Sequence, residues 1–266
     1  VEVRARTRPT RLTKTLPGPE QAVFSTAGVD VNELKAFMEQ NGLALIVSRD
    51  VTTRDQAAHH QPFNLKVSGT AHQTIGASGK IYEVAYLQLF QGDQLRGWTG
   101  CCGDTPAPGR RVLAQYLHDA SAVTNNPSVV GAPTSSVKIA NDGSVAAFVP
   151  AQRAMTWQLV DDTGTGIVRE RYWVTFQPGE IRMCTSCHGI NSEDQAGNAA
   201  PTNQPQALLE LLQDWKAKHC TDGSCGVATA TPQPATAAPP ATPTPPAADT
   251  PSPTVPPTAT ATPPPT

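Results

Sequence analysis

One short stretch of the chain combines the residue types and the spacing that covalent haem attachment requires. Residues 183–189 read Met-Cys-Thr-Ser-Cys-His-Gly, so that Cys184 and Cys187 are separated by two residues and His188 follows directly. Two thiols three positions apart can reach the two vinyl groups on one edge of a porphyrin, and the next residue can turn its imidazole toward the iron. The motif therefore predicts one covalent haem c on Cys184 and Cys187, with His188 as an axial ligand.

The same ligand types also serve other chemistry. A zinc site could combine the three motif residues with a second sulfur pair, Cys220 and Cys225, although four residues separate those two cysteines. A thiol redox pair would need its CxxC to open a helix after a strand in a βαβ unit. The residues before the motif instead resemble an antiparallel hairpin. Haem is therefore our first interpretation, and zinc and thiol redox chemistry are the alternatives.

The sixth iron ligand is less well defined by the sequence, because several side chains could supply it. A second histidine or a methionine is the usual partner in low-spin haem proteins. His118 lies in an irregular stretch, and Met155 lies on a predicted strand, where it could equally be a core residue beside Trp157. These two are our main candidates, and the other histidines considered are His59, His60, His72 and His219.

An empty sixth position would instead indicate ligand binding or catalysis. In that case a cationic or imidazole side chain near the distal face would donate hydrogen bonds to the bound ligand. The residues that could take this role are Arg153, Arg169, Arg171 and His118.

The four cysteines outside the motif, Cys101, Cys102, Cys220 and Cys225, form an even set. Covalent haem attachment takes place outside the cytoplasm, where disulfides persist, so we expect two bridges. A loop closed by Cys220 and Cys225 is the simplest local pairing. The adjacent Cys101 and Cys102 would then form a strained vicinal bridge, or the four would cross-pair.

Two segments have the periodicity of helices. The first runs from Asp30 to Gly42, with Asp30 as N-cap, Glu33 three positions later and Gly42 as the stop. The second lies at residues 205–218, with Pro205 near its first turn. Its apolar stripe could cover one face of a porphyrin or be ordinary core; it consists of Leu208, Leu211, Leu212 and Trp215.

Most other ordered segments read as strands. Alternating or apolar runs predict strands at 43–51, 63–69, 80–90, 154–160 and 167–176. Asn141-Asp142-Gly143 between two apolar runs predicts one hairpin, and residues 161–166 predict the turn of another. Residues 92–135 are turn-rich, and their apolar residues show no periodicity that decides between a helix and a strand. These elements predict a mainly β fold, an antiparallel β-sandwich with a few helices around the haem.

Composition divides the chain unevenly. Residues 226–266 hold 14 of the 26 prolines and carry one charged side chain, Asp249, and they have no aromatic residue. Such a segment cannot bury enough apolar surface to offset its ordering entropy, so we expect a disordered Pro/Thr-rich tail that acts as an extended spacer. We expect residues 1–135 to be a β-rich part with one helix. Residues 136–225, with the hairpins, the CxxCH motif and the last helix, are expected to form one unit with it.

Charge and hydropathy exclude two classes of partner. A formal net charge of −2 leaves no excess of basic residues that would bind nucleic acid. No apolar run approaches the roughly 20 residues of a transmembrane helix. The chain begins in charged, strand-like sequence, and we expect Val1 to be a processed or truncated start. The haem motif points to an extracytoplasmic protein, whether periplasmic, cell-surface or secreted. The tail is then either a stalk or linker that attaches the protein to a cell wall or surface, or a plain disordered end.

The region around the motif also resembles a known family. Residues 60–215, most strongly Gly143–Asn191, are similar to the haem-bearing region of the hydrazine synthase α-subunit family, which comprises large secreted c-type cytochrome proteins. The resemblance implies covalent haem on Cys184 and Cys187 with His188 adjacent. It does not carry over hydrazine synthesis, because that enzyme assembles several haems and this chain has one CxxCH. The resemblance also does not carry over the tyrosine ligation of haem iron that is associated with that enzyme, because no tyrosine follows His188 in this sequence.

Three hypotheses for function follow. The first is an extracytoplasmic monohaem c-type cytochrome that transfers electrons to and from redox partner proteins, other cytochromes among them. The second is a haem enzyme or sensor that binds a small nitrogen or oxygen ligand at an open sixth site. The third is a structural surface or filament module that haem or zinc stabilises. The sequence contains no second catalytic constellation, which favours the electron carrier over a catalyst.

Overall fold

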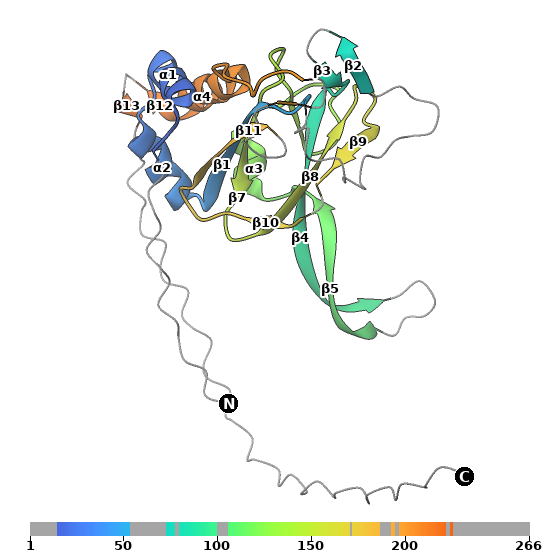
Figure 1. Cartoon of the computed structure of the whole chain (residues 1–266). Helices are drawn as coiled ribbons and strands as arrows, with labels where there is room; N and C mark the ends of the chain where they lie inside the picture. The colour runs from blue at the N-terminus through green and yellow to red at the C-terminus, as the bar shows by residue number, and fades with distance from the viewer. Residues whose placement is uncertain are drawn as a thin grey trace, which may run out of the picture. The chain divides into compact units, whose positions relative to one another are not determined.

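The described part of the chain is built mainly from β-strands, with a few helices beside them (Figure 1). The structure is a computed structural model. It describes residues 15–53, 73–77, 80–99, 106–170, 172–186, 193–194, 197–221 and 224–225. All of these residues belong to one unit of the chain, Val1–Thr229. Cys187, His188, Cys101, Cys102 and the predicted strand at 63–69 lie outside the described residues, as do residues 226–266.

Three strands form the small sheet, in the order β11 (Ile181–Ser186), β1 (Leu43–Asp50) and β7 (Val145–Pro150). β1 pairs antiparallel with β7 and parallel with β11. All six residues of β7 are buried, as are the first six of β1, so neighbouring elements cover both faces of this sheet.

The large sheet carries the central path β10 (Val174–Thr175), β8 (Ala154–Val160), β4 (Tyr86–Thr99) and β5 (Pro106–Tyr116). In addition, β6 (Ser136–Lys138) pairs with β4, and β9 (Gly166–Arg169) pairs with β8. All pairings in this sheet are antiparallel. The predicted mainly antiparallel β architecture is therefore confirmed, with the parallel pair β1 and β11 as the exception. Two short pairs complete the strands: β2 (Gln73–Ala77) with β3 (Lys80–Tyr82), and β12 (Cys220–Thr221) with β13 (Ser224–Cys225).

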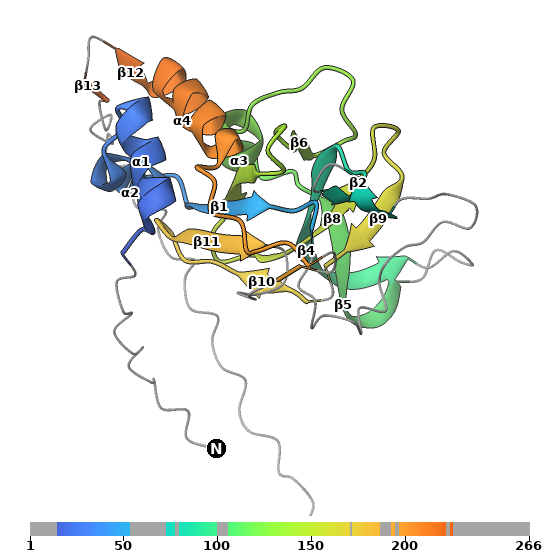
Figure 2. The same ribbon diagram turned by 45° about the horizontal axis from the view of Figure 1, so that its top comes forward.

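The helices lie beside the small sheet, as Figures 1 and 2 show. α2 (Val31–Gln40) packs against β1, while α3 (Ala120–Asn125) and α4 (Gln206–His219) pack against β7, and α1 (Gly18–Ala27) packs against α4. Buried residues of the helices, the small sheet and β4 and β8 of the large sheet form one hydrophobic cluster. The two sheets therefore share a core. Among the described residues, no helix is long and apolar enough to cross a membrane.

Both predicted helices are confirmed. The Asp30 side chain accepts hydrogen bonds from the N–H groups of Asn32 and Glu33, and Gly42 follows the helix with a φ of 64°. In α4 the predicted apolar stripe is fully or almost fully buried. The stripe packs into the shared core, which corresponds to the ordinary-core interpretation of that helix.

Several expectations about the strands need correction, including the strand predicted at 80–90, which is divided into β3 and β4. The turn at Asn141-Asp142-Gly143 forms, with a hydrogen bond from the Gly143 N–H to the Ala140 carbonyl, but its flanking strands do not pair with each other. β6 joins the large sheet and β7 the small one, so the turn is a corner between sheets. The strand predicted at 167–176 is divided into β9 and β10, with Tyr172 and Trp173 exposed between them. Residues 92–135, which lacked a decisive period, contain most of the long hairpin of β4 and β5.

Candidate functional site

The first cysteine of the motif lies on the outermost strand of the small sheet. In β11, Cys184 stands opposite Ser48 of β1 and is exposed, and Ser186 stands opposite Asp50. Among the strands that the structure describes, β11 pairs with β1 alone and so lies at the edge of this sheet. The two remaining motif residues, Cys187 and His188, follow directly after this strand and lie outside the described residues.

Strand alternation separates the side chains of β11 into two sets. Ile181 and Met183 pack against the hydrophobic core. Arg182 and Cys184 are on the opposite face, where the Arg182 guanidinium carbon lies 4.7 Å from the centre of the Phe176 ring. Arg182 also donates two hydrogen bonds to Glu180, at 3.0 and 2.7 Å. The exposed cysteine therefore shares its face of the strand with a partly exposed cation.

The described part of the motif fits a covalently attached macrocycle. A thioether bond requires a cysteine side chain that a large flat group can approach, and Cys184 meets this condition at the end of an edge strand. The donor set of two thiols and one imidazole is the set for c-type haem.

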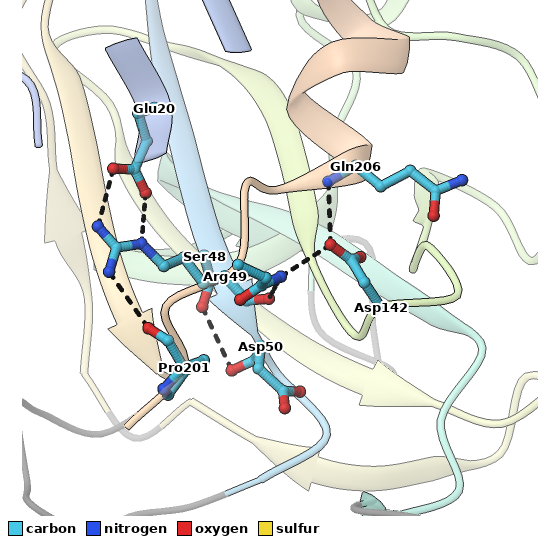
Figure 3. Close-up of polar contacts among 8 residues, drawn as sticks. Glu20, Ser48, Arg49, Asp50, Asp142, Pro201 and Gln206 are labelled. Carbon is cyan, nitrogen blue, oxygen red and sulfur yellow. Dashed lines mark hydrogen bonds and ion pairs between the residues drawn. The ribbon is translucent and has the colours of Figure 1, made fainter. Parts of the chain in front are cut away.

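A buried ion pair holds the neighbouring part of β1. Arg49 donates from Nε and one Nη to the two carboxylate oxygens of Glu20, at 2.7 and 2.9 Å, and from its other Nη to the Pro201 carbonyl at 3.2 Å (Figure 3). The Glu20 side chain is 1% exposed and that of Arg49 is 13% exposed. The hydrogen bond to Glu20 raises the pKa of Arg49 above its ordinary value, against the opposing effect of burial.

Asp142 forms a second attachment, which joins the turn between β6 and β7 to the start of α4 (Figure 3). Its Oδ2 accepts hydrogen bonds from the Asn203 side chain at 2.7 Å and from the Gln206 N–H at 3.0 Å. Its Oδ1 accepts from the N–H and hydroxyl of Ser144. Burial acts to raise the pKa of Asp142, but these hydrogen bonds outweigh it, and the net pKa is lowered.

Together these contacts fasten both sides of the motif to one strand. The residues up to Ser186 are paired with β1. Further along the chain, the Pro201 carbonyl bonds to the Arg49 side chain, and the Asn203 side chain donates to the Arg49 carbonyl at 3.1 Å. The chain therefore leaves β11 opposite Asp50 of β1. After the segment that contains Cys187 and His188, it contacts β1 again at Arg49.

Met155, one of the two main candidates for the sixth ligand, is fully buried in β8. It pairs with Gln91 of β4 and Val174 of β10 and belongs to the hydrophobic core. This is the environment of a packing residue, and as an iron ligand Met155 would have to leave it.

His118, the other main candidate, is half-exposed after β5, with 57% of its side chain accessible. Its Nδ1 lies 2.9 Å from the Tyr116 carbonyl, which is the usual second contact of a metal-binding histidine. Its Nε2 lies 3.0 Å from the Gln91 amide and 3.3 Å from the Asp93 carboxylate. Binding iron through Nε2 would replace those two contacts.

The other proposed ligands and donors are distributed over several elements. His219 ends α4, where burial, together with the charge of Lys218, lowers its pKa. Arg153 pairs with Asp93, and Arg169 donates to Gln158. His59, His60, His72 and Arg171 lie outside the described residues.

The cysteines at the end of α4 are bonded to each other. Cys220 and Cys225 form a disulfide, as the sequence predicted, and close the hairpin of β12 and β13. Cross-pairing with Cys101 or Cys102 is thereby absent from this structure. Sulfurs joined in a disulfide are not thiolates, so the zinc alternative loses its second sulfur pair. Within the described ranges, no group of three or more His, Cys, Asp or Glu residues is arranged to hold a metal ion.

Comparison with known proteins adds one family to this picture. Residues 97–189 match the family model of the hydrazine synthase alpha subunit middle domain. The matched stretch ends at Gly189 and so includes the complete CxxCH motif. Among solved structures, Kuenenia stuttgartiensis hydrazine synthase matches with a TM-score of 0.35 and 15% identity over 63% of this chain. The chain spans 20% of the length of that protein. No curated protein sequence matches.

Sequence reasoning missed several residues around the site, namely Glu20, Arg49 and Arg182. Glu20 and Arg49 are charged partners that lie 29 residues apart in the sequence. Arg182 pairs with Glu180 two residues away, but no short motif marks any of the three as part of a site. Asp142 was noted as part of a turn, but its role in starting α4 depends on Asn203 and Gln206, 61 and 64 residues away.

Proposed function

We propose that this chain is an extracytoplasmic monohaem c-type cytochrome that transfers single electrons. The haem would be bound covalently by Cys184 and Cys187, with His188 as an axial ligand. The observation that carries this proposal is the complete CxxCH motif inside the stretch that matches the hydrazine synthase family model, with Cys184 exposed on an edge strand. When bound, the haem would supply a one-electron couple.

The chain's own residues would orient the haem segment. β11 carries Cys184 beside β1, and Arg49 and Asp142 fasten the returning chain. Support of this kind on both sides of the motif would limit how far an axial histidine moves between oxidation states, and this would favour fast electron exchange. We expect the partners to be redox proteins, other cytochromes among them, and the tail to serve as a spacer to a wall or surface.

The decisive experiment is a pyridine haemochrome spectrum on denatured protein, exported in a host that attaches c-type haem. We expect one haem c for each chain, and none in a variant with Cys184→Ser and Cys187→Ser. A matched control changes Cys220 and Cys225 to serine instead and should retain the haem. A wild-type protein that lacks haem and contains stoichiometric zinc would reject the proposal.

A second candidate is a haem protein that binds a small ligand at an open sixth site. It is favoured by the engagement of Met155 in the core and of the His118 ring with Gln91 and Asp93. A high-spin native spectrum that changes on addition of CO or NO would support this candidate over the electron carrier. A low-spin spectrum that becomes high-spin in His118→Ala or Met155→Leu would identify the ligand.

A further inference from the structure

We propose that Arg182 is the residue that binds a carboxylate of the attached haem. This inference rests on the proposed haem attachment and extends it from the thioether edge of the macrocycle to its acidic side chains. Haem carries two propionate carboxylates, and a carboxylate removed from water needs a cation or N–H donor. Arginine suits this role because its planar guanidinium can donate two parallel hydrogen bonds.

The first argument is position on the strand. Arg182 and Cys184 are two residues apart in β11, about 7 Å along the strand, and their side chains share one face. β1 and β11 carry two cations in all, Arg49 and Arg182. Arg49 follows Ser48, the partner of Cys184, so alternation puts it on the other face, where it is committed to Glu20. Arg182 is therefore the cation of these two strands that accompanies Cys184.

The second argument is the state of the guanidinium. Arg182 lies over the fully buried ring of Phe176, and its side chain remains 37% exposed. Its two hydrogen bonds to Glu180 both end on Oε1 and use Nε and one Nη. An arginine has five N–H donors, so the group can bind a second carboxylate without leaving the first. Phe176 and Glu180 thus hold this cation on the face of β11 that also carries Cys184.

The test compares Arg182→Gln with wild-type holoprotein by measuring the reduction potential as a function of pH. A haem carboxylate beside a cation ionises at lower pH, by about one unit or more. In Arg182→Gln we therefore expect the pH-dependent step, the pH at which the reduction potential changes, to rise by about one pH unit. The reduction potential at neutral pH should fall, because a positive charge near the haem is lost. Arg182→Lys, which keeps the charge but not the paired donors, should give an intermediate profile.

Lys138→Gln is the matched control, because Lys138 is an exposed cation on β6 of the large sheet, and its profile should equal that of wild type. If Arg182→Gln does not fold or load haem, Glu180→Gln decides instead. Removing that competing carboxylate should move the step to lower pH. An unchanged step in the haem-loaded variant would overturn the role of Arg182 and leave the haem assignment intact, whereas a wild-type haemochrome without haem c would overturn both.

Discussion

Arg49 and Glu20 form a largely buried ion pair in which both carboxylate oxygens of Glu20 accept hydrogen bonds from one guanidinium. The pair joins α1 to β1, and its third contact, to Pro201, joins both to the chain that follows the CxxCH motif. The pair thus contributes to packing and to the candidate site at once. Removing one partner would leave the other charge buried and uncompensated.

The first prediction concerns this pair. Glu20→Gln should lower the free energy of unfolding by about 3 kcal/mol, because breaking a buried ion pair from one side is costly. Urea denaturation followed by circular dichroism would measure the loss. Glu210→Gln, at an exposed position of α4, should change the stability by less than about 0.5 kcal/mol. A double variant, Glu20→Leu with Arg49→Met, should lose less than Glu20→Gln, and an equal or larger loss would contradict this account.

The second prediction concerns the pH dependence that Asp142 imposes. The native state lowers the pKa of this carboxyl, so the ionised form is favoured on folding. Its stabilising contribution is complete above the unfolded-state pKa, about 3.9, and is lost as the pH falls through the lower folded-state value. Asp142→Asn should therefore be less stable than wild type at pH 7, by about 1 kcal/mol. The difference should shrink below about pH 4. A difference that stays constant from pH 7 to pH 2 would argue against it.

An element of the fold could be predicted from the sequence when the pattern that specifies it lies within one short segment. α2 and α4 were predictable because their caps and apolar stripes lie within one segment. α1 has a regular buried face as well, but that face begins with Glu20 and continues through Val23, Phe24 and Ala27. A stripe that starts with a charged residue does not read as apolar. Its buried partner, Arg49, is 29 residues away, and nothing local marks the pair.

The candidate site was predictable to a similar extent. Cys184 became a candidate because CxxCH is a local pattern, and its role stays a prediction. The disulfide of Cys220 with Cys225 was predicted correctly because the two residues are close in sequence. The turn at Gly143 was also predicted correctly, yet the sheets to which β6 and β7 belong depend on non-local pairing with β4 and β1. Arg182 acquires its significance only from strand alternation beside Cys184 and from the Phe176 ring.

The third prediction compares two glycines with positive φ, Gly143 at 83° and Gly42 at 64°. A Cβ at Gly42 would meet nothing within 4 Å, so Gly42→Ala should cost only the backbone strain, about 1 kcal/mol. A Cβ at Gly143 would collide with the Asp50 carboxylate and lie 3.3 Å from the Thr52 hydroxyl. Gly143→Ala should therefore cost about 3 kcal/mol. Thermal unfolding of both variants checks the order, and equal losses would show that the close approach to Asp50 is unimportant.

The fourth prediction concerns His219, whose Nε2 lies 2.6 Å from the Asn125 side-chain oxygen and whose ring packs on Phe37. Burial and the neighbouring Lys218 lower its pKa, so the native state favours the neutral ring and the unfolded state binds the proton more readily. Stability should then be constant above the unfolded-state pKa, about 6.5, and should fall as the pH drops below it toward the lower folded-state value.

His219→Gln keeps a donor for Asn125 and removes the titration. The unfolding free energy of wild type should therefore decline relative to this variant when the pH is lowered from 7 to 5, as measured by urea denaturation at each pH. His118→Gln is the matched control, because that ring is half-exposed, and it should leave the decline in place. Parallel pH profiles for wild type and His219→Gln would mean that the ring is not preferentially neutral in the folded protein, and the packing on Phe37 would then have to accommodate a charged imidazole.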